Sequence, residues 1–139
     1  MTEPLWLKRA WIDALHFQQL KRFGGAYGVR DDGAVESALA RPRNRWGHDE
    51  ETDLASLAAE YGFGFARNHG YAAANKRIAF LAMAAFLELN GLRLDAPEPE
   101  VVRTIVGLAA GDIDLPALAD WLRRRTHAPD ADVDRAPIA

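Results

Sequence analysis

The sequence has no cysteine, no long hydrophobic run and only a small excess of charge of one sign. Without cysteine, neither a disulfide framework nor a thiolate metal site is possible, and a reducing compartment is permitted. The longest strongly apolar run, residues 78–87, has ten residues, about half of what spans a bilayer, and therefore predicts a buried helix. Acidic and proline residues follow Met1 where a signal peptide would need a basic start and an apolar run. We therefore expect a cytoplasmic protein that does not bind a membrane.

The composition is that of one folded domain. Hydrophobic residues make up 49% and charged residues 27% of the 139 residues, which is ordinary for a globular protein and enough for a single core. The net charge of -3 gives no overall attraction to nucleic acid, so any anion site has to be local. We expect one domain over residues 1–125, followed by a flexible polar tail over residues 126–139.

Apolar residues at helical spacing predict an all-α, single-domain bundle of about six helices, with little strand-like alternation. The helix over residues 75–89 is apolar on nearly every face and is expected to be central. Gly62 and Gly64 are expected to weaken the end of the helix before it. The expected helices cover residues 8–23, Asp31 or Asp32 to Ala40, Thr52 or Asp53 to about Phe65, 75–89, 97–110 and 115–125.

The second of these helices is expected to end early. Arg41 precedes Pro42, and the residue before a proline is disfavoured in the helical conformation. Residues 43–51 are polar and include Gly47. They are therefore expected to form a loop or a small flap.

The segment from Asn68 to Arg77 carries the candidate chemistry. A loop of small residues leads into a helix, where free backbone N–H groups and the positive end of the helix dipole favour an anion such as phosphate. Lys76 and Arg77 place two cations in the first turn, where acidic residues are normally favoured, and a bound polyanion would resolve that conflict. His69 lies a few residues earlier, and neutral imidazole is well suited to accept a proton from a hydroxyl.

These residues also allow a second interpretation. His69 can be an ordinary histidine at a helix end, with Lys76 and Arg77 facing solvent, because misplaced charges at helix ends cost little free energy. The residue chemistry alone does not separate the two interpretations.

The same segment resembles the signature of the Fic/Doc family. That signature reads His, any residue, an aromatic, any residue, an acidic residue, a small residue, Asn, Gly or Lys, then Arg. Residues 33–42, 53–61 and 78–91 also resemble the helices around the family's motif, so that the resemblance covers most of residues 10–95. The residues that fit the signature are His69, Tyr71, Ala74, Asn75, Lys76 and Arg77.

The resemblance implies a role for each matching residue. His69 would be the general base that deprotonates a target hydroxyl, and Tyr71, in place of the usual phenylalanine, would anchor the loop in the core. Asn75 and the backbone around Ala74 would line the phosphate-binding nest. Arg77 would pair with phosphate oxygens.

Lys76 indicates the Doc branch of the family. Members that transfer AMP usually have glycine at this position, whereas Doc-like members carry lysine and transfer the terminal phosphate of ATP. By resemblance the chain is a toxin kinase that modifies elongation factor Tu or another translation protein and arrests translation. The Ser56–Glu60 pair does not match an internal inhibitory helix, which favours a separate, Phd-like antitoxin that inserts a helix into a groove.

Ala73 is the main departure from the signature. The family has an acidic residue here, which holds the Mg²⁺ that bridges the nucleotide phosphates, and alanine supplies no oxygen ligand. Since phosphoryl transfer depends on neutralising the transferred charge, we predict that the chain is inactive or impaired as written. Either the substitution was engineered so that a toxic protein could be expressed, which we favour because the rest of the motif is intact, or the chain is a natural degenerate member kept for binding.

The other candidate residues are interpreted as structural or exposed. The remaining histidines lack metal-ligand spacing, the tryptophans are expected to pack, and Glu98 and Glu100 suit a helix start. Arg123, Arg124 and Arg125 suit a helix end, so direct nucleic-acid contact is not expected. Two alternative functions remain beside the kinase: an AMP-transferase that tolerates Lys76, and a non-catalytic binding module. The residues dismissed or left undecided are His16, His48, His127, Trp6, Trp11, Trp46, Trp121, Arg41, Arg43 and Arg45.

Overall fold

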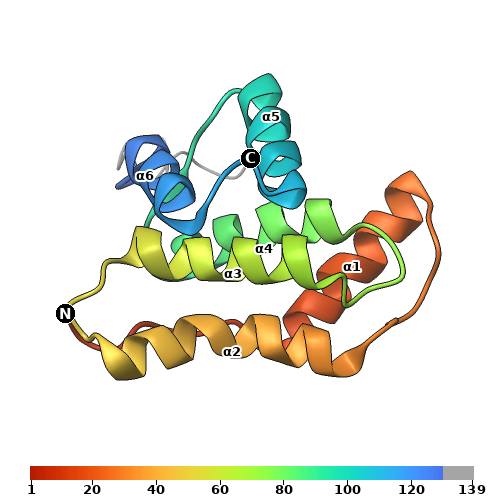
Figure 1. Ribbon diagram of the computed structural model, residues 1–139, viewed down its shortest axis with the longest axis horizontal. Helices are drawn as coiled ribbons and strands as arrows, with labels where there is room; N and C mark the ends of the chain where they lie inside the picture. Colours follow the sequence, from red (N-terminus) through yellow and green to blue (C-terminus); the bar gives the residue numbers. More distant parts are fainter. Residues whose placement is uncertain (130–139) are drawn as a thin grey trace, which may run out of the picture.

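The computed structural model describes residues 1–129, and these form a helical bundle with one very small sheet (Figure 1). The all-α architecture of about six helices is confirmed. Within residues 1–129, every helix is too short or too polar to traverse a lipid bilayer. The elements are α1 (Arg9–Phe23), α2 (Asp32–His48), α3 (Leu54–Asn68), α4 (Asn75–Leu89), β1 (Arg93–Leu94), α5 (Glu98–Ala110), α6 (Leu115–Arg125) and β2 (Thr126–His127).

Two helices share the centre of the bundle. Figure 1 shows α3 running between α2 on one side and α5 and α6 on the other. Eleven of the fifteen residues of α3 are buried, and α4, the helix predicted to be central, packs against α1, α3 and α5. The residues that link the end of α3 to the start of α4 are therefore attached to the two central helices of the fold.

The predicted early end of α2 is wrong. The helix continues through Pro42 to His48, so residues 43–48 are helical and not a loop or flap. A proline inside a helix removes one hydrogen bond and crowds the preceding turn, but contacts on both sides of Pro42 hold this helix against the core. Arg41 pairs with Glu60 of α3 at 3.1 Å, and Trp46, one turn after the proline, is 8% exposed. Tertiary packing therefore overrides the local preference.

The two glycines of α3 are close-approach positions. A Cβ at Gly62 would lie 2.3 Å from Sδ of Met83 in α4, and one at Gly64 would lie 2.9 Å from Cα of Ala38 in α2. The predicted end of this helix near Phe65 is wrong, since α3 runs on to Asn68. Their small size lets α2 and α4 pack directly on the backbone of α3.

The small sheet was not expected from the sequence. Arg93 pairs with His127, and Leu94 with Thr126, in antiparallel register. The first two residues of the predicted tail are therefore strand, while residues 130–139 lie outside the described residues. The sheet brings the end of α6 back to the segment after α4.

Candidate functional site

A six-residue loop, residues 69–74, joins α3 to α4 and has a left-handed residue at each end. His69 ends α3 with φ 53°, and Ala74 begins α4 with φ 67°. Positive φ is uncommon for residues other than glycine. Within residues 1–129, both non-glycine residues with positive φ therefore lie in the segment predicted to carry the chemistry.

The loop is held from inside by the side chain of Asn75. Its Oδ1 accepts a hydrogen bond from the Tyr71 backbone N–H at 3.1 Å, and its Nδ2 donates to the Tyr71 carbonyl at 2.9 Å. The predicted place of Asn75 in a phosphate nest therefore rests on its backbone N–H, because the side-chain amide is already engaged with the loop.

The segment between α1 and α2 holds the loop from outside. The N–H groups of Arg30 and Asp31 both donate to the Gly70 carbonyl, at 2.9 and 3.0 Å, and Ala72 donates to the Gly28 carbonyl at 3.1 Å. A Cβ at Gly70 would lie 2.5 Å from Cγ2 of Val35. A side chain at position 70 would therefore push the loop away from the start of α2.

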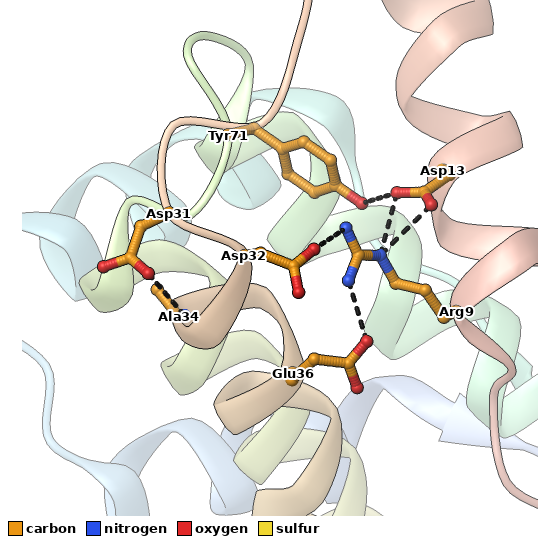
Figure 2. Close-up of polar contacts among 7 residues, drawn as sticks. All are labelled: Arg9, Asp13, Asp31, Asp32, Ala34, Glu36 and Tyr71. Carbon is orange, nitrogen blue, oxygen red and sulfur yellow. Dashed lines mark hydrogen bonds and ion pairs between the residues drawn. The ribbon is translucent and has the colours of Figure 1, made fainter.

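Tyr71 anchors the loop, as predicted, and its hydroxyl has a specific partner. The side chain is 1% exposed, and the hydroxyl donates to Oδ1 of Asp13 at 2.7 Å (Figure 2). Burial, together with the hydrogen bond to Asp13, raises the pKa of Tyr71 well above its usual value. Arg9 in turn binds Asp13 at 3.0 Å, Asp32 at 2.8 Å and Glu36 at 2.7 Å. The phenolic group therefore stays protonated and ties the loop to the junction of α1 and α2.

His16 lies against the loop, although its position in the sequence does not indicate a place at the site. It was expected to be structural or exposed, and it is 5% exposed. Its ring stacks on that of Tyr71 with centroids 3.9 Å apart, and its Nε2 lies 3.0 Å from the Ala73 carbonyl oxygen. It lies 57 residues before Ala73, so spacing in the sequence gave no signal for this contact.

The five residues predicted to bind phosphate or act as base come together around one pocket. Its volume is about 350 Å³. His69 and Lys76 are exposed, while Ala74, Asn75 and Arg77 are half-buried. The lining residues are His69, Ala74, Asn75, Lys76, Arg77 and Ala109.

The amino end of α4 opens into this pocket without a cap from a side chain. No carboxylate pairs with Lys76 or Arg77 among the described residues, and no acidic residue lies in the first turn. Arg77 bonds weakly to the Gln19 carbonyl at 3.4 Å and lies over the ring of Phe23. Free N–H groups, the helix dipole and two cations give the pocket the character of an anion site.

The residues present do not form a magnesium site. Residues 1–129 contain no group of three or more His, Asp or Glu side chains that could hold a metal ion. The half-buried Ala73, next to the pocket, offers only a methyl group, and Mg²⁺ requires oxygen ligands. Among residues 1–129, no cluster of side chains offers the oxygens that a divalent cation would need here.

The other candidates from the sequence lie away from the pocket. Ser56, in the first turn of α3, and Glu60, near its middle, are buried and bond to Arg123 and Arg41, respectively. Arg43 lies over the ring of Trp6. None of the three undecided arginines lines the pocket. Packing partners therefore account for the side chains of Ser56, Glu60, Arg41 and Arg43.

Similarity to known proteins agrees with this geometry. A family model described as the Fic/DOC family matches residues 6–87. A protein of Escherichia phage P1 named "Protein kinase doc" is 38% identical over 111 residues, which is 80% of this chain and 87% of that protein. A protein of Mycolicibacterium smegmatis named "Toxin Doc" is 41% identical over 75 residues, 53% of this chain and 58% of that protein. With its helical fold and these relatives, the chain belongs to the Fic/Doc family and to the Doc branch within it.

Proposed function

We propose that the chain is a Doc-like toxin whose site transfers the terminal phosphate of ATP to a hydroxyl of a translation protein, elongation factor Tu by resemblance. The observation that carries the proposal is the pocket that His69 shares with the uncapped start of α4 and with Lys76 and Arg77. A proton acceptor thus lies beside a site suited to phosphate. Relatives named as a kinase and as a toxin support the reaction class and its effect on the cell.

The proposed reaction needs one proton acceptor and one anion site. A ring nitrogen of His69 takes the proton of the target hydroxyl while its oxygen forms a bond to the terminal phosphorus of ATP. The bond between that phosphorus and the oxygen bridging to ADP breaks, and ADP leaves with the electron pair. The α4 amides, Lys76 and Arg77 stabilise the charge on the phosphates during the transfer.

Ala73 limits this reaction. The Mg²⁺ that family members use with ATP has no carboxylate ligand at position 73. We therefore propose that the chain is impaired as written and that Ala73→Asp restores transfer. In metal-dependent phosphoryl transfer, the metal ion contributes several kcal/mol of charge stabilisation to the transition state. This is the contribution that the chain lacks.

The test compares Ala73→Asp with the unaltered chain and with Ala73→Asn, which has the same shape and no charge. Each form is incubated with purified elongation factor Tu, or with bacterial extract, and with ATP labelled on its terminal or its innermost phosphate. We expect terminal label to reach a protein only with Ala73→Asp, and to be lost when His69→Ala is added. Innermost label would support the AMP-transferase instead, and no transfer to any protein would favour the non-catalytic binding module.

For the partner, we propose a Phd-like antitoxin that places an amphipathic helix in the groove between α1, α4 and α5. The groove has a volume of about 390 Å³ and includes Lys76 and Arg77, so it is continuous with the phosphate pocket. Acidic residues on such a helix would complement these two cations. Apolar groove residues include Phe23, Phe80, Leu81, Val102 and Val106.

A Val106→Glu substitution tests this placement. Val106 is 50% exposed, so that the change should leave the fold intact while it introduces charge into the groove. We expect at least tenfold weaker binding of the phage P1 antitoxin Phd, whereas Leu5→Glu, at a site 61% exposed outside the groove, should bind as the unaltered chain does. Equal binding by both variants would place the antitoxin elsewhere.

A further inference from the structure

The peptide between Ala73 and Ala74 is turned toward α1 by His16. A carbonyl oxygen can only accept, so Nε2 of His16 carries the hydrogen and donates it to the Ala73 oxygen at 3.0 Å. The imidazole ring has little freedom to move, because it is 5% exposed and stacks on Tyr71.

This peptide also sets the backbone conformation of the residue that begins α4. Because a peptide unit is planar, the direction of the Ala73 carbonyl and the φ angle of Ala74 change together. Ala74 has φ 67°, a strained conformation for a residue with a Cβ. Rotation of the peptide would return φ to negative values and relieve the strain. It would also break the hydrogen bond from His16.

The rotation would affect the anion site directly. Neither His16 nor Ala73 lines the pocket, whereas Ala74 does. In the present conformation, the Ala73 oxygen lies against His16 of α1 and does not line the pocket. A rotated peptide would move the partial negative charge of this oxygen away from α1. The pocket would then contain this carbonyl oxygen as well as the first-turn N–H groups.

His16 belongs to a row of contacts along one face of α1. Asp13, one turn earlier, accepts from the Tyr71 hydroxyl, and the Gln19 carbonyl, one turn later, accepts from Arg77. After the helix, a Cβ at Gly25 would lie 3.3 Å from Cβ of Ala73. Among these contacts, the one from His16 acts on the peptide that sets the start of α4.

We infer that His16 is a positioning residue, which holds the Ala73–Ala74 peptide so that the amino end of α4 stays open to an anion. The identity of that anion as an ATP phosphate rests on the proposed function. The conformation of the peptide does not rest on the proposed function. The peptide conformation and the binding of ATP are therefore tested by separate measurements.

The first measurement uses the unaltered chain. Long-range ¹H–¹⁵N spectra report which ring nitrogen of His16 is protonated. We expect hydrogen on Nε2, and backbone shifts and couplings that place Ala74 at positive φ. A His16 ring with a bare Nε2 would overturn the inference without any substitution.

The second measurement compares His16→Leu with His16→Gln, whose amide N–H groups provide a donor of similar reach. We expect Ala74 to leave positive φ in the leucine variant and to keep it in the glutamine variant. His48→Leu, at an exposed histidine at the end of α2, is the matched control and should leave Ala74 unchanged. Positive φ at Ala74 in His16→Leu would overturn the inference.

Titration with ATP links the conformation to binding. We expect His16→Leu to bind ATP about tenfold more weakly than the unaltered chain, which corresponds to about 1.4 kcal/mol, and His16→Gln to regain most of the loss. The same titration in the Ala73→Asp background separates the two proposals: if neither background binds ATP, the proposed function fails, whereas the conformation of Ala74 still decides the role of His16.

Discussion

Replacing Tyr71 by phenylalanine should measure how firmly the loop is tied to α1. The hydroxyl is buried and donates to Asp13 at 2.7 Å. A hydrogen bond to a charged group contributes about 1.5–3 kcal/mol, but we expect a value below that range here. The Asp13 side chain is 46% exposed and keeps its ion pair with Arg9. We therefore expect Tyr71→Phe to lower the free energy of unfolding by about 1 kcal/mol and Tm by about 3–5 °C.

Thermal and urea unfolding of four proteins would test this value: the unaltered chain, Tyr71→Phe, Asp13→Ala and the double variant. Asp13→Ala should cost more than Tyr71→Phe, because it leaves a buried hydroxyl without an acceptor. The coupling energy between the two positions should be about 1 kcal/mol. Tyr27→Phe, at a tyrosine that is 64% exposed, is the matched control and should change little. A coupling energy near zero would refute the view that this bond holds the loop.

Two further predictions concern α3. Gly64→Ala should lower the free energy of unfolding by about 1–2 kcal/mol, because the clash of the new methyl group with Ala38 outweighs the gain in helix propensity. Gly47→Ala in α2, where a Cβ meets nothing within 4 Å, is the control and should raise Tm slightly. A rise in Tm for both variants would contradict this reasoning. Asp53 caps α3 and has a lowered pKa, chiefly through its hydrogen bond from Arg123. Its charged form therefore adds stability above the ordinary carboxyl pKa, and this is lost as pH falls toward the lowered value. Asp53→Asn, which keeps the cap, should lower the free energy of unfolding by less than about 1 kcal/mol at neutral pH. The difference in Tm between this variant and the unaltered chain should disappear toward pH 2. A difference that stays constant with pH would argue against the ion pair.

Local signals in the sequence were sufficient for most of the helices. The bounds of α4 and α6 agree with those predicted, since each helix has a clear apolar pattern and a breaking residue beside it. The loop of residues 69–74 was also predicted closely, because its small residues and the polar start of α4 lie together in the chain.

Contacts between distant residues account for what the sequence did not reveal. Proline before a polar stretch normally ends a helix, and only the packing of Arg41 and Trp46 against the core explains why α2 continues. The role of His16 depends in the same way on the folding of α1 against a loop 57 residues later. Periodicity within α1 could not indicate that partner.

The starts of the other helices show why that of α4 suits an anion. Asp31, Asp53 and Asp114 cap α2, α3 and α6 with side-chain hydrogen bonds, and α5 has two glutamates in its first turn. α1 also lacks a cap, but three carboxylates surround its first cation, Arg9.

At α4, the first turn has neither a cap nor an acid, and two cations follow a strained residue. Each of these features opposes folding of the free chain. A bound polyanion would relieve the unpaired charge and satisfy the open N–H groups together. Among the described helices, the start of α4 is where these preferences are violated without compensation, which is typical of a site kept for function, and this start lines the pocket of His69.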